Sequence, residues 1–264
     1  MSSCIRAGVS KLVRPGALGY PGAMLLDKAW KPEAVWLLGV RICLTLLGGM
    51  MLLSAAKRWT DPLDRNQADF LAFVVGTLCF QGAALAWVHS FLREHATGWR
   101  DGFGLSLLVP RHWAKGAVLT LLGLLPTLAL LGKGSEWVLR HLGVKVEMQA
   151  AVLMLQNHPS ALHLLGFGIG AILLAPVAEE VLFRGIIYPV LKQTGFPALA
   201  WWGSSLIFAG IHLNLMAFIP MTVLALVLAR LYERTGNLLA PILVHVLFNA
   251  TNFTLALFIE APPV

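Results

Sequence analysis

The sequence has few charged residues. Asp, Glu, Lys and Arg make up 12% of its 264 residues, and hydrophobic residues make up 58%. Soluble globular domains carry about 25% charged residues, so this composition excludes an ordinary soluble domain. The apolar residues fall in long blocks, and a block of about 20 such residues matches the thickness of a bilayer core. The sequence therefore predicts an all-α, polytopic transmembrane helical bundle.

Several other features are scarce or missing, and each absence excludes a class of protein. The three cysteines, Cys4, Cys43 and Cys79, have neither paired nor metal-binding spacing, which argues against a disulfide framework or a cysteine metal site. The net charge is +7, but no basic patch is interleaved with aromatic residues, so no nucleic-acid partner is predicted. The motifs GxSxG and HExxH are both absent.

The apolar blocks divide the chain into about seven spans. An eighth stays open, because the segment 135–155 is amphipathic and suits either the membrane surface or a partial helix. The fourth block contains GFGIGA, in which Gly166 and Gly170 are predicted to be small residues for helix packing. The seven expected spans are 34–56, 69–92, 114–132, 161–183, 197–216, 217–232 and 238–258.

The Lys and Arg residues predict the orientation of these spans. Thirteen lie in the N-terminal tail and in the connections that would share its side of the membrane, and six lie in connections on the other side. Because excess positive charge marks the cytoplasmic side, the N-terminus is predicted to be cytoplasmic. The composition further suggests a bacterial plasma membrane.

Two adjacent carboxylates interrupt the apolar run 173–190, LLAPVAEEVLFRGIIYPV. In a helix Glu180 and Arg184 share a face and form a natural ion pair, which leaves Glu179 free to act as a base. The alternative is a solvated cap at the end of a span. Charges inside a membrane are costly and usually mark function, so the first interpretation is favoured.

Two later spans carry further polar residues. Phe208 and His212 stand four residues apart, as do His245 and Asn249, and in a helix each pair shares a face. Such groups need partners inside a membrane. Together with the glutamates they predict one interior cavity between the C-terminal helices.

The predicted cavity suits water-mediated hydrolysis of a peptide bond. Carboxylate and imidazole groups activate water directly, or they hold a divalent metal such as zinc, for which Glu179, His212 and His245 are the candidate ligands. Both routes stay open, with the metal slightly favoured. Asn249 and a histidine are candidate donors to a developing oxyanion.

Three motifs, EExxxR, FxxxH and HxxxN, stand in this order at Glu179–Arg184, Phe208–His212 and His245–Asn249. They resemble the signature motifs of the CAAX prenyl protease / bacteriocin-processing (Abi) family of intramembrane proteases. The resemblance implies that Glu179 and His212 activate water, that His245 and Asn249 stabilise the oxyanion or complete the polar cluster, and that Glu180 and Arg184 support them. It covers about residues 161–255.

The predicted organisation is a single membrane domain: a cytoplasmic tail (1–33), N-terminal membrane helices (34–160) and a catalytic helical core (161–258). The expected function is an intramembrane endopeptidase acting on a membrane-bound protein or peptide. The resemblance allows prenylated proteins, bacteriocin-type peptides or C-terminal sorting signals as substrates. An ion- or proton-coupled transporter and a non-catalytic membrane binding protein are the alternatives. The sequence does not indicate an oligomeric state.

Overall fold

The computed structural model describes residues 28, 30–56, 65–105, 111–146, 155 and 160–258, and helices account for nearly all of them. No strand occurs within these ranges, so the predicted all-α class is confirmed. The elements in chain order are α1 (Pro32–Ala56), α2 (Arg65–Thr77), η1 (Leu78–Gly82), α3 (Ala83–Glu94), α4 (Trp99–Phe103), α5 (Arg111–His141), α7 (Ala161–Gly168), η2 (Ile169–Leu174), α8 (Ala175–Glu180), η3 (Val181–Ile187), α9 (Tyr188–Gln193), α10 (Pro197–Gly210), α11 (Leu215–Thr235) and α12 (Leu239–Ala256), the three η segments being π-helical.

Six helices in the described ranges are long and apolar enough to cross a membrane. The predicted fifth span, 197–216, is shorter than expected: α10 has 14 residues, about 21 Å of helix, and ends at Gly210. Part of the amphipathic segment 135–155 continues α5 as far as His141, and residues 147–154 lie outside the described residues. The six crossing helices are Pro32–Ala56, Gln67–Glu94, Lys115–His141, Ala161–Gln193, Leu215–Thr235 and Leu239–Ala256.

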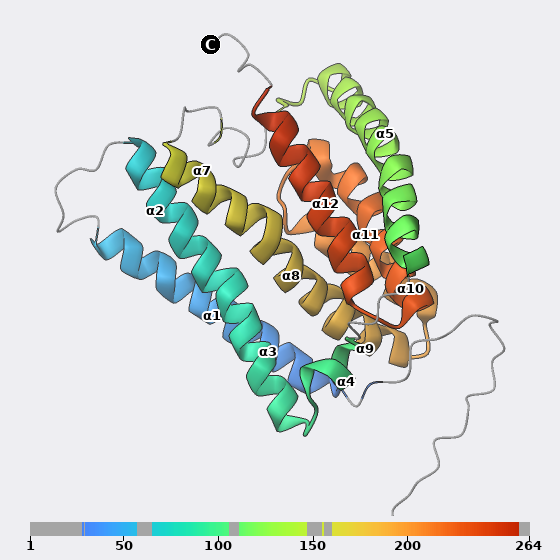
Figure 1. Cartoon of the computed structure of the whole chain (residues 1–264). Helices are drawn as coiled ribbons and strands as arrows, with labels where there is room; N and C mark the ends of the chain where they lie inside the picture. The colour runs from blue at the N-terminus through green and yellow to red at the C-terminus, as the bar shows by residue number, and fades with distance from the viewer. Residues whose placement is uncertain are drawn as a thin grey trace, which may run out of the picture.

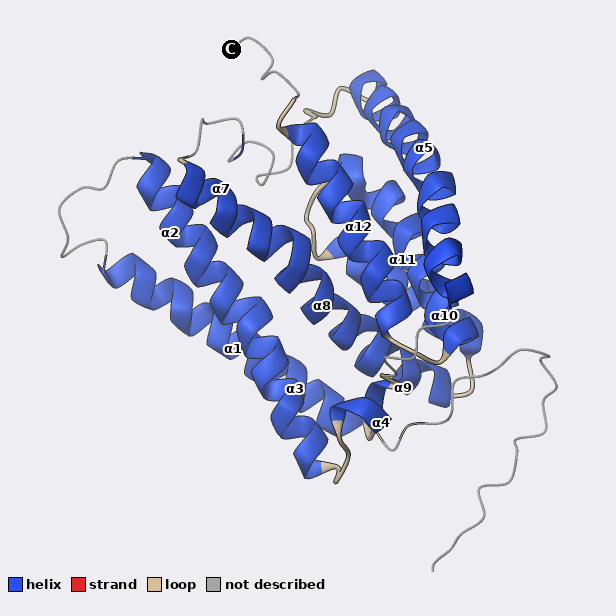
Figure 2. Ribbon diagram, in the orientation of Figure 1, coloured by secondary structure: helices blue, strands red, loops and turns tan. Residues whose placement is uncertain are grey.

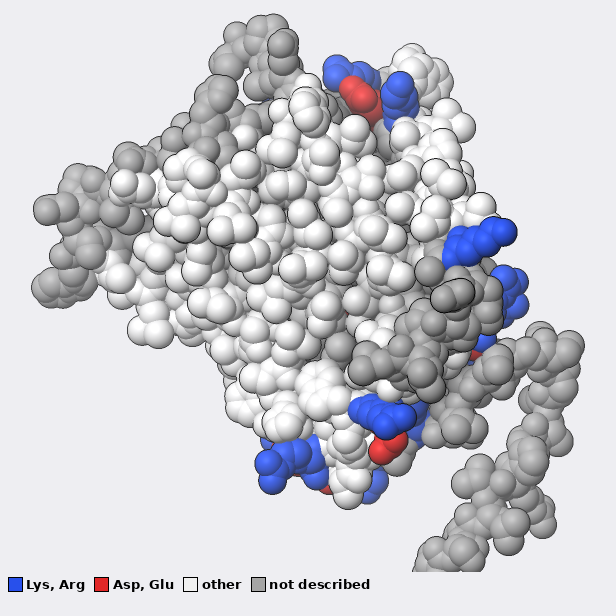
Figure 3. All heavy atoms as spheres, in the orientation of Figure 1, with Lys and Arg blue, Asp and Glu red and all other residues white. Residues whose placement is uncertain are grey.

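The surface of the molecule carries its charges in separate groups. On the face drawn in Figure 3 charged side chains gather at the upper edge and along the lower and right edges, and the broad centre shows none. Large apolar side chains are exposed elsewhere on the surface, among them Leu119, Leu122 and Leu130 on α5. An apolar belt between polar rims is the surface of a protein that spans a bilayer.

The continuous helix from α7 to α9 runs through the middle of the bundle. In Figures 1 and 2, α1, α2 and α3 lie on one side of it, and α5, α11 and α12 lie on the other. The core that encloses α8 and η3 draws on both sides, with Phe91 and Phe103 from the N-terminal part and Phe208 and Leu238 from the C-terminal part. The chain therefore shares one core across the predicted boundary at residue 160, and the functional division at that boundary stays a prediction.

The start of α1 and the end of α12 lie at opposite ends of the bundle (Figure 1). The segment before α1 lies at the same end as α4 and α9, because Lys28 Nζ donates to the Asp101 carbonyl and the Gln193 side chain donates to the Lys28 carbonyl. Lys192, at the end of α9, pairs with Glu233 of α11 at 2.6 Å. These contacts bring together segments that the charge count assigned to one side. That this side is cytoplasmic stays a prediction.

Gly166 and Gly170 of the GFGIGA stretch are packing positions, as predicted. The Phe70 ring of α2 lies over Gly166, where an added Cβ would come within 2.8 Å of it. The Phe73 ring lies over Gly170, where an added Cβ would be 2.6 Å away. Small residues at these positions let the two helices approach closely.

Gly168 gives a matched control for this packing. A Cβ added there would meet Phe253 at 3.7 Å, an ordinary van der Waals contact. Because overpacking a close contact costs about 1–3 kcal/mol, Gly170→Ala is expected to be less stable than Gly168→Ala by that amount. Thermal unfolding in detergent measures the difference, and equal melting temperatures would contradict the assigned packing.

Candidate active site

Glu180 and Arg184 form the predicted ion pair inside the bundle. Glu180 is fully buried and Arg184 is 2% exposed. Arg184 Nη1 donates to Glu180 Oε1 at 2.8 Å, and Nη2 donates to the Ala225 carbonyl of α11 at 3.1 Å. The guanidinium carbon lies 4.6 Å from the centre of the Phe208 ring. A buried charge needs this many partners, so the alternative of a solvated cap is excluded.

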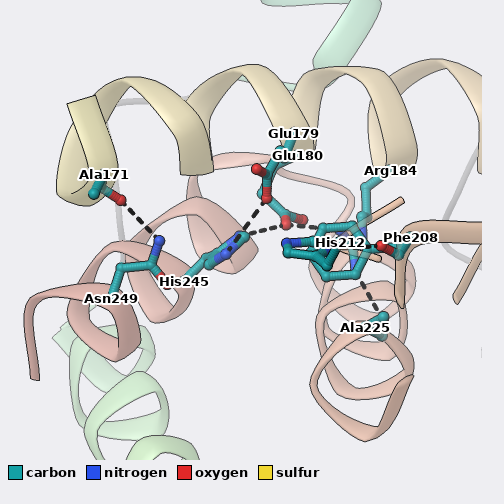
Figure 4. Close-up of polar contacts among 9 residues, drawn as sticks. All are labelled: Ala171, Glu179, Glu180, Arg184, Phe208, His212, Ala225, His245 and Asn249. Carbon is teal, nitrogen blue, oxygen red and sulfur yellow. Dashed lines mark hydrogen bonds and ion pairs between the residues drawn. The ribbon is translucent and has the colours of Figure 1, made fainter. Parts of the chain in front are cut away.

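His245 joins the two glutamates (Figure 4). Its Nδ1 lies 2.8 Å from Glu180 Oε1, and its Nε2 lies 3.8 Å from Glu179 Oε2. Because a carboxylate that is paired with arginine only accepts hydrogen bonds, Nδ1 carries the proton in this contact. The other nitrogen, Nε2, therefore faces Glu179 without a proton when the ring is neutral.

His212 follows the end of α10 and adopts the same tautomer. Its Nδ1 lies 2.8 Å from the Phe208 carbonyl, which only accepts, so Nδ1 donates and Nε2 is left free. Glu179 interacts electrostatically with both His212 and His245. The Phe208 ring contacts both imidazoles, with centroids 5.0 Å from His212 and 5.9 Å from His245. Phe208 thereby packs against both rings.

Asn249 makes a contact that the sequence did not predict: its Nδ2 donates to the carbonyl of Ala171 in η2 at 2.8 Å. At the end of η2 the Ala175 amide donates to the carbonyl of Gly170, five residues back. In the same register the donor to the Ala171 carbonyl would be the amide of Pro176, which has no hydrogen. Asn249 supplies the missing donor. The second hydrogen on Nδ2 stays available, and the oxyanion role of Asn249 stays a prediction.

The residues predicted from three separate spans thus lie around one cluster. Glu179 and Glu180 end α8, Arg184 lies in η3, His212 follows α10, and His245 is in α12. Glu180 Oε2 is buried and has no hydrogen-bond partner within the described part of the chain. The cluster combines a carboxylate held in an ion pair with a second carboxylate beside two imidazoles, an arrangement suited to proton transfer.

The chemical groups of the cluster are ones that bind divalent metals, but their placement does not form a metal site. Histidines that bind metals commonly donate from the other ring nitrogen to a carboxylate or carbonyl, as both imidazoles do here. Within the described ranges, however, no group of three His, Cys, Asp or Glu side chains is placed to hold a metal ion. The predicted ligands Glu179, His212 and His245 therefore do not meet as a three-ligand site in this arrangement, and a role for a metal stays a prediction.

Sequence reasoning missed the two backbone carbonyls, of Ala171 and Ala225, that complete the cluster. Pro176 was the available signal for Ala171, because a proline withholds a hydrogen bond from a preceding carbonyl. No signal in the sequence pointed to Ala225, since its place beside Arg184 depends on how α11 packs against η3.

The fold and the cluster together define a polytopic helical membrane protein with a buried Glu–Arg–His site. Residues 161–251 match the family described as type II CAAX prenyl endopeptidase Rce1-like. The predicted resemblance to CAAX prenyl proteases is therefore confirmed over this segment, which holds every residue of the cluster.

Two proteins of Bacillus subtilis (strain 168) are similar to the chain. The uncharacterized protein YpbD is 38% identical over 82 residues, which cover 30% of this chain and 39% of YpbD. The putative membrane peptidase YdiL is 28% identical over 197 residues, which cover 72% of this chain and 73% of YdiL. No solved structure matches the chain.

Proposed function

We propose that the protein is an intramembrane endopeptidase that hydrolyses a peptide bond with water activated by Glu179. The observation that carries this proposal is the position of Glu179 Oε2, 3.8 Å from the free Nε2 of His245 in a buried cluster. That separation is too long for a hydrogen bond and matches two atoms that a water bridges at about 2.8 Å from each. The match to a family of membrane endopeptidases supports the same conclusion.

In the proposed reaction Glu179 accepts one proton from the water while Nε2 of His245 accepts a hydrogen bond from the other. The water oxygen attacks the carbonyl carbon of the substrate, and the C=O electrons move to the oxygen, forming a tetrahedral oxyanion. The electrons then return, the C–N bond breaks, and Glu179 gives its proton to the leaving nitrogen. One water is consumed, and a carboxylic acid and an amine are formed.

The other residues of the cluster hold and complete this arrangement. Glu180 fixes the tautomer and orientation of His245, and Arg184 holds Glu180 in place by pairing with it. The remaining Nδ2 hydrogen of Asn249 is the proposed donor to the oxyanion. His212, which also interacts electrostatically with Glu179, is the proposed alternative to His245 as acceptor for the second hydrogen of the water.

The proposed substrate is a membrane-bound protein or peptide, because the site is enclosed by helices that cross the membrane. The three substrate classes expected from the sequence give a direct test. Wild-type protein and Glu179→Gln in proteoliposomes would receive three fluorescence-quenched peptides: a farnesylated CaaX peptide, a bacteriocin leader and a sorting-signal peptide. Cleavage of at least one by the wild type and of none by the variant is expected. Absence of cleavage together with a Glu179-dependent proton flux would contradict the proposal and favour a transporter.

Removing metal ions distinguishes activation of water by Glu179 from activation by a bound divalent metal. The proposed route through Glu179 needs no metal, so protein dialysed against a strong chelator is expected to keep its activity with well under one metal ion per chain. Bound metal measured by mass spectrometry, together with the cleavage rate, tests this expectation. Lost activity that zinc or cobalt restores would contradict the route and support the metal predicted from the sequence.

A further inference from the structure

The segment before α1 contacts the helix that carries the cluster. Trp30 is 4% exposed, and its indole Nε1 donates to the carbonyl of Gly185 at 3.2 Å. Gly185 directly follows Arg184 in η3. The contact joins two positions 155 residues apart, and Trp30 lies outside the segment 161–251 that matches the family.

The sequence gives a reason why the backbone at this turn needs outside donors. Pro189 has no amide hydrogen, so it cannot donate to Gly185 in an α-helical register. In the register of η3, where the Tyr188 amide donates to Phe183 five residues back, Pro189 instead leaves the Arg184 carbonyl without its helical donor. Where the π-helical register ends beside this proline, the indole of Trp30 donates to the Gly185 carbonyl.

Trp30 is held firmly at this position. Its ring packs edge-on against Phe91, with centroids 5.2 Å apart, and against His95, with centroids 5.4 Å apart. On the same stretch of η3, the Phe103 ring lies so close to Gly185 that a Cβ there would be 2.6 Å from it. The N-terminal part of the chain thus contacts η3 through both a hydrogen bond and close packing.

The same design occurs on the other side of the glutamates. There Asn249 of α12 donates to Ala171, a carbonyl of η2 that Pro176 leaves without a donor. The two π-helical segments flank α8, so the glutamates lie between two backbone sites that side chains from other helices complete.

We propose that Trp30 is a positioning residue for the cluster: its indole N–H keeps η3 in its π-helical register and thereby keeps Arg184 in place to hold Glu180. The catalytic consequence rests on the proposed function, whereas the structural link between Trp30 and η3 does not. Removing the N–H is therefore expected to loosen η3 and to slow the chemical step without weakening substrate binding.

The test uses two substitutions at Trp30 in the full chain. Trp30→Phe removes the N–H and keeps an aromatic ring, and replacement by 3-benzothienylalanine removes the N–H while keeping the shape of the indole. The control is Trp87→Phe, which removes an indole N–H that donates at 3.0 Å to Thr45 of α1 and not to a carbonyl of η3. Hydrogen–deuterium exchange of peptides covering 181–190 reports on the backbone directly.

The net contribution of one hydrogen bond corresponds to about a five-fold change in an equilibrium constant or a rate. Exchange in 181–190 is expected to rise about that much in both Trp30 variants and to stay unchanged in Trp87→Phe. For the peptide that the wild type cleaves, kcat is expected to fall by about the same factor with KM within two-fold. Unchanged exchange in the benzothienylalanine protein would overturn the proposal, as would a change in KM alone.

The two readouts also separate this proposal from the proposed function. If the wild type cleaves none of the peptides but exchange in 181–190 rises only in the Trp30 variants, the proposed function fails and the link between Trp30 and η3 stands. If the wild type cleaves a peptide and the Trp30 variants match it in both exchange and kcat, the proposed function stands and this inference is wrong.

Discussion

Glu179→Gln is expected to lower kcat for peptide cleavage by a factor of about 10²–10⁴, the contribution of a general base, while the protein stays folded in the membrane. Gln keeps the size of the side chain and cannot accept the proton of the attacking water. Because Glu179 has no arginine partner of its own, its removal strands no buried cation, so the melting temperature should change little. Cleavage assays on purified protein measure the effect, with thermal unfolding beside them.

The control for this variant is Glu136→Gln, which changes a half-exposed carboxylate on α5. It is expected to leave cleavage unchanged. His212→Ala and His245→Ala are expected to abolish cleavage as Glu179→Gln does, because each removes an imidazole beside the proposed water. A rate for Glu179→Gln within a few-fold of wild type would remove Glu179 from the mechanism.

Glu180→Ala is expected to cost both activity and stability. Glu180 is fully buried and its Oε1 accepts hydrogen bonds from both Arg184 and His245. Removing one partner of a buried ion pair leaves the other charge uncompensated and typically costs about 3–5 kcal/mol. His245 loses the acceptor that fixes its tautomer in the same step. Chemical or thermal unfolding in detergent should therefore show a large loss, together with a low protein yield.

The chain offers a matched control for this second prediction. Glu136 and Arg140 form an ion pair with the same spacing on α5, at 2.7 Å, but Arg140 is 67% exposed. Exposed pairs contribute about 0.2–1 kcal/mol, so Glu136→Ala should change stability little. If Glu180→Ala were as stable as wild type and Glu179→Ala were unstable, the roles assigned to the two glutamates would be reversed.

The sequence predicted the cluster well because the membrane makes polar residues conspicuous. Glu179, Glu180 and Arg184 stood out from an apolar run, and the helical spacing of four residues correctly placed Glu180 beside Arg184. Gly166 and Gly170 were predicted as packing positions for a similar reason, since small residues in a span mark a close approach of two helices.

Other features could not be predicted, because they depend on packing between distant segments. Spacing suggested that Glu180 pairs with Arg184 alone, whereas His245 of α12 also donates to it. The π-helical register of η2 and η3 leaves no mark in hydrophobic periodicity, although Pro176 and Pro189 were hints of unsatisfied carbonyls. The docking of Trp30 on Gly185 joins residues too far apart in the chain for any local pattern to connect.

The most direct test of the central claim needs no assumption about the substrate. Cells producing wild-type protein or Glu179→Gln at equal levels would be compared by mass spectrometry of the protein termini in their membranes. The proposed activity predicts termini that occur only with the wild type and that map to membrane-bound proteins or peptides. Identical sets of termini in the two samples would contradict the claim that this buried cluster hydrolyses peptide bonds.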